Sequence, residues 1–154
     1  MKPAPRDWPR FSSSVCYRDA AAAIDWLCEA FGFEVRLRVE GEAGRIEHSE
    51  LTYGEGLLMV GQEPDAGDGP QAWKRCMRSP ASLDGANTQC VMFFVDDADE
   101  HCEHARARGA RIIEEPATHD YGEDYWTDRS YGALDPEGHL WWITQRLRGP
   151  AVRS

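Results

Sequence analysis

The sequence predicts an α+β fold built from two similar βαβββ modules. The expected elements run strand, helix and three strands, and the same order then repeats. The helix ends support this repeat, because Gly32 and Gly109 each follow a helical stretch and lie about 77 residues apart. A chain of 154 residues is most simply one domain. We therefore expect a single domain, 1–154, with a first module at 11–62, a connecting loop at 63–88 and a second module at 89–147.

The first module begins with a short strand and a helix. Residues 11–17 alternate as a strand does, and Asp19 is a good N-cap for the helix that follows. The helix ends at Gly32, a residue type that readily adopts the left-handed conformation of a C-cap. Its apolar stripe consists of Ile24, Leu27, Cys28 and Phe31.

Three strands complete this module. The stretches 33–39 and 45–53 alternate as strands do, and Gly41 and Gly44 bracket the turn between them. The apolar run 57–60 predicts a third strand that is buried on both faces.

The connecting loop, 63–88, is long, rich in Gly, Pro and Asp, and without a clear period. Loops of this length in compact domains are often functional. It contains Trp73, Lys74 and Arg75, and we expect that these side chains could fold over a site.

The second module repeats the order of the first. Residues 89–95 predict a strand, Asp97 begins a capping box, and Gly109 closes the helix. The apolar stripe of this helix consists of Ala98, Cys102 and Ala105. A strand at 111–115 and a polar loop at 116–125 come next.

The chain closes on a hairpin with a strong turn signal. Asp135-Pro136-Glu137-Gly138 has the residue preferences of a type I turn. The strand after it, 139–145, is rich in aromatic and β-branched residues, and its alternation puts Leu140, Trp142 and Thr144 on one face. If that face lines a cavity, it carries the chemistry of the second module.

The composition favours a globular protein and a limited set of partners. The net charge of −10 works against binding a nucleic-acid backbone or an anionic membrane, and it makes cationic or neutral ligands easier to accommodate. A simpler interpretation of the surplus acid is solubility. The odd number of cysteines, five, without a C-x-x-C motif indicates free thiols in a reducing cytoplasm. The first ten residues predict no signal peptide, and no apolar run approaches the roughly 18 residues of a membrane helix.

Several motifs together resemble one known family. D-A-A-A-A-I-D-W-L opens the first helix, A-F-G-F-E ends it, and D-P-E-G-H-L-W-W forms the last hairpin. In this order they resemble the glyoxalase/bleomycin-resistance/dioxygenase group, the vicinal oxygen chelate superfamily, over residues 11–146. The resemblance implies that each module curls into a cup, that the cups form a barrel-like mixed sheet around one cavity, and that the protein is a homodimer. It does not define an activity, because the group includes lyases, isomerases, dioxygenases, drug-modifying transferases and binding proteins.

Metal enzymes of this family hold a divalent ion with His or Gln on the first strand of each module and Glu on later strands. The resemblance places these ligands on Ser12, Glu50, Cys90 (or Gln89, if the register shifts by one) and Trp142. Only Glu50 is retained, since Ser is a poor ligand for a hard ion and Trp cannot serve as one. One carboxylate and one thiol do not make a zinc site. We therefore expect no metal, no cofactor and no catalytic residue.

These replacements favour a metal-independent protein that binds small molecules, of the drug- or metabolite-sequestering type. The expected cavity is lined by Ser14, His48, Glu50, Cys90, Met92, Trp126 and Trp142. Trp142 would stack on the ligand, Glu50 would pair with a basic or hydroxyl group, and Trp126 would cap the cavity.

Two other functions stay open. A metal-dependent lyase or dioxygenase would use His48, Glu50 and Cys90 as a rearranged site for Zn, Ni, Mn or Fe. A dimeric interaction domain would hold no ligand and would fill its cavity with its own side chains. His48 is either a replacement ligand or base held by Glu50, or a polar residue in a wet cavity. Because Cα atoms two apart in a strand are separated by about 6.5–7 Å, a contact between these two residues is not assumed.

Two further polar features flank the last hairpin. Acidic residues form a loop together with aromatic residues just before it: Asp120, Tyr121, Glu123, Asp124, Tyr125 and Trp126. They form either the rim of a site for a cationic or aromatic ligand or a solvated loop. His139 follows the turn directly, where we expect it to be exposed.

Overall fold

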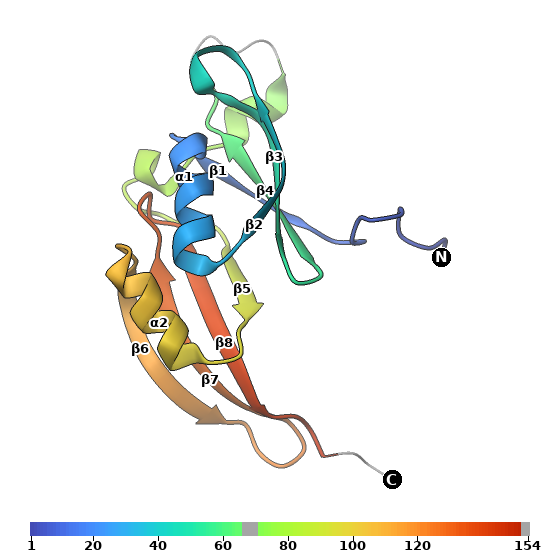
Figure 1. The fold of residues 1–154 in the computed structure, drawn as a ribbon, viewed down its shortest axis with the longest axis vertical. Helices are drawn as coiled ribbons and strands as arrows, with labels where there is room; N and C mark the ends of the chain where they lie inside the picture. Colours follow the sequence, from blue (N-terminus) through green and yellow to red (C-terminus); the bar gives the residue numbers. More distant parts are fainter. Residues whose placement is uncertain (66–70, 152–154) are drawn as a thin grey trace. The chain divides into compact units, whose positions relative to one another are not determined.

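The computed structural model describes residues 1–65 and 71–151 and divides the chain into two compact units, Met1–Ala86 and Asn87–Ser154. The segment expected to connect the modules, 63–88, therefore belongs almost entirely to the first unit. Each unit contains one βαβββ module, which confirms the predicted fold (Figure 1). No helix in the described parts of the chain is long and apolar enough to span a membrane.

The elements of the first unit surround one four-stranded sheet. They are β1 (Ser13–Tyr17), α1 (Ala20–Trp26), the π-helical turn η1 (Leu27–Phe31), β2 (Glu34–Glu40), β3 (Ile46–Tyr53) and β4 (Gly56–Gln62), with short 3₁₀ helices η2 (Glu42–Gly44), η3 (Ala72–Cys76) and η4 (Pro80–Ser82). The strand order is β1-β4-β3-β2, with β1 parallel to β4 and the other pairs antiparallel.

The second unit has the same topology. Its elements are β5 (Cys90–Phe94), α2 (Ala98–Ala107), β6 (Arg111–Asp120), β7 (Thr127–Leu134) and β8 (Leu140–Arg148). The order β5-β8-β7-β6 reproduces that of the first sheet, again with one parallel pair, β5 with β8.

In each unit the helix packs against one face of its own sheet. In the first unit Asp19 caps α1 by accepting a hydrogen bond from the N–H of Ala22, and Gly32 ends the helical segment with φ of 80°. Ile24 and Leu27 of the apolar stripe are fully buried, and α1 contacts β1, β3 and β4. Since successive strand residues point to opposite sides, this packing leaves the other face of each sheet available for a site.

Strand β6 runs well beyond its predicted end, and the loop expected at 116–125 shrinks accordingly. The strand pairs with β7 as far as Asp120, which lies opposite Thr127. Its register shifts twice, between Ile112 and Glu114 and between Glu114 and Ala117. These bulges interrupt the two-residue alternation from which a strand is recognised.

The last turn forms as predicted and is anchored by a buried carboxylate. The N–H of Gly138 donates to the carbonyl of Asp135 at 2.9 Å. The Asp135 carboxylate accepts from the N–H groups of Glu137 and His139 and from the indole Nε1 of Trp141, each at 3.0 Å. The expectation of an exposed His139 is wrong, because this side chain is only 7% exposed. The backbone of His139 belongs to this anchored turn, because its N–H donates to the buried Asp135 carboxylate.

Candidate functional site

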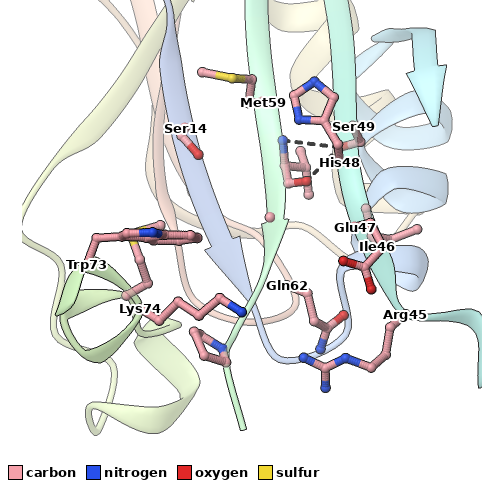
Figure 2. Close-up of a pocket in the computed structure, with 14 residues that line it drawn as sticks. Ser14, Arg45, Ile46, Glu47, His48, Ser49, Met59, Gln62, Trp73 and Lys74 are labelled. Carbon is pink, nitrogen blue, oxygen red and sulfur yellow. Dashed lines mark hydrogen bonds between the residues drawn. The ribbon is translucent and has the colours of Figure 1, made fainter. Parts of the chain in front are cut away.

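A pocket of about 210 Å³ lies between the first sheet and the segment that carries η3 (Figure 2). Its lining comes from β1, β3, β4 and the segment that carries η3. The lining residues are Ser14, Arg45, Ile46, Glu47, His48, Ser49, Met59, Val60, Gly61, Gln62, Pro64, Trp73, Lys74 and Met77. The pocket thus combines strand residues with residues from the segment expected to connect the modules.

Two of the predicted site residues, Ser14 and His48, line this pocket. Ser14 is paired in register with Met59 on β4, and Met59 is paired with Glu50 on β3. Paired residues of neighbouring strands point to the same side of a sheet. Ser14, Met59 and Glu50 therefore form one row across the sheet. His48 lies two residues before Glu50 on β3.

Glu50 is held by two side chains of its own unit. It is only 7% exposed, and its Oε2 lies 3.2 Å from Nε of Arg36 while its Oε1 lies 2.9 Å from Nε2 of His48. Arg36 also donates to the carbonyl of Asp7 at 2.5 Å and lies over the ring of Trp8 at 5.4 Å. Both carboxylate oxygens are thus engaged before any ligand arrives.

The side chains of His48 and Glu50 are in contact, although the distance between their Cα atoms did not by itself predict this. A carboxylate can only accept hydrogen bonds, so Nε2 of His48 donates and its Nδ1 is the acceptor in the neutral ring. The His48 side chain is 44% exposed and lines the pocket, whereas the Glu50 side chain is 9% exposed and is not part of the lining. Glu50 therefore orients His48, and His48 meets the solvent.

Trp73 and Lys74 are lining residues that belong to no strand. They lie on η3, and Figure 2 shows both side chains across from those of β3. Lys74 Nζ is 5.9 Å from the centroid of the Trp73 ring. The sequence indicated that this segment could fold over a site. It did not identify Met59 as a pocket residue, because Met59 belongs to an apolar run that predicts a buried strand.

The other four predicted site residues lie in the second unit. Cys90 and Met92 on β5 are paired with Leu140 and Trp142 on β8, so the residues of these two pairs share one face of the second sheet. Met92 is 53% exposed. A Cβ on Gly132 of β7 would be 3.3 Å from two carbons of the Trp142 indole, which shows that this ring lies over Gly132. This face is apolar and aromatic.

Trp126 has an internal partner on the same unit. The guanidinium of Arg146 lies 5.1 Å from the centroids of both Trp126 and Phe94, and its Nε lies 2.5 Å from Oδ1 of Asp128. A cation over an aromatic face is attracted by the ring electrons. The Trp126 face that was expected to cap a ligand is thus in contact with an arginine of its own chain.

The internal repeat makes Met59 the counterpart of Trp142. Each lies on the last strand of its module, next to a residue of the first strand, Ser14 or Met92. On the other side, Met59 is paired with Glu50 and Trp142 with Gly132. Glu50 therefore corresponds to Gly132. The Glu50 carboxylate lies on β3, one strand away from Met59 on β4, which is the residue that matches Trp142.

These side chains do not fit the divalent metal site of the family. Trp142 offers no ligand atom, and the counterpart Met59 offers only a soft thioether. Glu50, the one retained carboxylate, already contacts Arg36 and His48. Within residues 1–65 and 71–151, no group of three or more His, Cys, Asp or Glu side chains is placed to hold a metal ion.

Two cysteines, Cys28 on η1 and Cys102 on α2, have thiols that are shielded by burial. Burial is the main cause that raises the pKa of the Cys28 and Cys102 thiols above the usual value. A raised pKa keeps a thiol protonated and unreactive at neutral pH. Neither residue is suited to nucleophilic chemistry.

Comparison with known proteins gives the class of this protein. The sequence model of the Glyoxalase/Bleomycin resistance protein/Dioxygenase superfamily matches residues 12–143, and the chain belongs to that superfamily. The predicted family is thereby confirmed.

The chain is similar to several individual proteins. An uncharacterised protein of Mycobacterium bovis is 30% identical over 140 residues, which cover 91% of this chain and 85% of that protein. The crystal structure of TioX from Micromonospora sp. ML1 is 30% identical with a TM-score of 0.65, covering 90% of this chain and all of TioX. A superfamily member from Sphaerobacter thermophilus, 15% identical with a TM-score of 0.61 over 90% of this chain and 98% of that one, shares the fold.

Proposed function

We propose that this protein binds small molecules without a metal, as a drug- or metabolite-sequestering member of its superfamily. The observation that carries the proposal is the pocket of the first unit, in which strand residues and the η3 segment together enclose about 210 Å³. Binding pockets typically combine apolar walls with a few oriented polar groups. Met59, Met77 and Trp73 supply the walls here, and His48 is an oriented polar group.

The contacts of Glu50 support the metal-independent part of the proposal. A divalent ion would need the carboxylate oxygens that Arg36 and His48 occupy, and it would have to sit beside the guanidinium charge. In this proposal Glu50 serves mainly to hold His48, and Trp142 offers a second stacking surface on the other unit. Its face is lined by Cys90 and Met92 as well.

Elemental analysis of protein purified without chelators tests this proposal. We expect less than stoichiometric Zn, Ni, Mn and Fe in the wild-type protein, and the same content in Glu50→Gln as its control. One tightly held divalent ion per chain, lost in the Glu50→Gln variant, would overturn the metal-independent function.

The short contact between His48 and Glu50 also favours a second candidate function. It brings together two of the three residues that a metal-dependent lyase or dioxygenase with a rearranged site would use. That candidate predicts that added Zn, Ni, Mn or Fe confers an activity which Glu50→Ala abolishes. Activity that is independent of added metal, or unaffected by Glu50→Ala, would count against it.

We further propose that the protein acts as a homodimer in the cytoplasm and engages neither nucleic acid nor membranes. The charge of −10 supports the exclusion of polyanionic partners. Sedimentation velocity at several concentrations measures the oligomeric state, and a species of monomer mass throughout would rule out the dimer.

A further inference from the structure

The pocket of the first unit places one flat aromatic surface beside one cation. We infer that it binds a planar aromatic molecule that carries a single ionised acid group, such as a carboxylate. This inference rests on the proposed small-molecule function and names the ligand class of that same site. Trp73 supplies the stacking surface and Lys74 the countercharge.

Trp73 presents its indole to the pocket, with the ammonium group of Lys74 over the ring at 5.9 Å from its centroid. It lines the pocket and is nevertheless 61% exposed. Within a helix as short as η3 (Ala72–Cys76), it has little apolar surface of its own element to cover it. An indole in this position gains the most by stacking on a second flat apolar surface.

Among the described residues, Lys74 is the lining cation that forms no ion pair with an acid. Arg45, the other strongly basic lining residue, lies 2.5 Å from the carboxylate of Asp65. Within the described ranges, no carboxylate forms an ion pair with Lys74, and its ammonium group lies 5.9 Å from the centre of the Trp73 ring. An acid group on a molecule stacked against Trp73 therefore comes within reach of this charge.

The described carboxylates of the lining and of the neighbouring row have other neighbours than Lys74. Among the described residues of the lining, Glu47 is the one acid, and its side chain lies against Gly41, where it leaves no room for a Cβ. Glu50 is held by Arg36 and His48. Lys74 thus offers a nearby positive charge to an anionic ligand even though the whole chain is acidic, since charges beyond the screening length of about 8–10 Å contribute little.

Three isosteric probes separate charge from stacking. They are 2-naphthoate, the neutral 2-naphthamide and the cationic 2-naphthylmethylammonium, and their dissociation constants are measured by calorimetry or ligand-observed NMR at neutral pH. We expect 2-naphthoate to bind about tenfold more tightly than 2-naphthamide, as for a charge-assisted hydrogen bond. The ammonium probe should bind most weakly, because it faces Lys74 with the same sign of charge.

Matched variants assign the effect to these two residues. Lys74→Met keeps the side-chain stem and should reduce 2-naphthoate binding to the level of 2-naphthamide. Arg75→Met removes the same charge from the next residue, which does not line the pocket, and should leave the preference intact. Trp73→Ala should weaken all three probes, with circular dichroism used to verify that each variant is folded.

Equal binding of naphthoate and naphthamide, no binding of any probe, or an equal loss in Arg75→Met and Lys74→Met would overturn the inference. None of these results changes the metal content by which the proposed function is judged. Conversely, a stoichiometric divalent ion would overturn the proposed function even if naphthoate binds as expected. The two proposals therefore fail in distinguishable ways.

Discussion

The N-terminal and C-terminal units share one strand order and place different chemistry at matching positions. In the first, the row across the sheet reads Ser14, Met59 and Glu50, and the carboxylate is tied to two basic side chains. In the second, the matching row reads Met92, Trp142 and Gly132, and it is apolar. The same backbone thus supports a polar row in one unit and a stacking surface in the other.

Neighbouring residues in these rows depend on one another. The large indole of Trp142 fits because its neighbour Gly132 has no side chain, whereas the slimmer Met59 leaves room for Glu50 beside it. Residues that share one face of adjacent strands are in direct contact, so their sizes are coupled. The divergence of the two units is therefore a change of pairs rather than of single residues.

The largest expected difference between the units concerns their last turns. Asp135 is 5% exposed and accepts three hydrogen bonds in the second unit, whereas the corresponding turn of the first unit is formed by Gly54 and the exposed Glu55. We expect Asp135→Ala to lower the free energy of unfolding by about 3 kcal/mol, because it leaves buried donors without partners. Urea denaturation measures this loss.

The control for that turn is Glu55→Ala, which should change the free energy of unfolding by less than about 0.5 kcal/mol. A loss of the same size in both variants would mean that the two turns contribute equally. The anchoring role of Asp135 would then be wrong.

The pairing of Trp142 with Gly132 predicts a smaller effect and a rescue. Gly132→Val should cost about 1–3 kcal/mol in unfolding free energy, because its side chain would collide with an indole only 3.3 Å from a Cβ at that position. Combining it with Trp142→Met, the residue of the first unit, should restore most of the loss. A double-mutant cycle in urea measures the coupling, and additive losses would contradict the size exchange.

The sequence was most informative where local chemistry determines structure. The caps at Asp19 and Gly32 and the turn at Asp135 depend on residues within a few positions, so the pattern predicts them directly. The bulges around Glu114 could not be predicted, because they depend on the pairing of β6 with β7.

The site was harder to predict than the fold for a similar reason. The contact of His48 with Glu50 depends on side-chain conformation, and the capture of Glu50 by Arg36 depends on the register of β2 against β3. Met59 reads as core in an apolar run, and only the sheet pairing places it in the pocket row. The alternation along a sequence predicts which face of a strand a residue occupies, but it does not predict which side chains that residue contacts on the face.

The smallest expected effect concerns two arginines on the same strand. Arg36→Met leaves the nearly buried Glu50 with His48 alone, and we expect a loss of about 1–2 kcal/mol in unfolding free energy, reduced by the partial exposure of the arginine. Arg38→Met is the matched control, since Arg38 pairs with the well exposed carboxylates of Asp25 and Glu40 and should cost less than about 0.5 kcal/mol. Thermal and urea unfolding of both variants measure the difference. If Arg38→Met lowers the free energy of unfolding by as much as Arg36→Met, then Arg36 stabilises the polar row of the first unit no more than a surface ion pair would. The contrast with the apolar second unit would then rest on Trp142 and Gly132 alone.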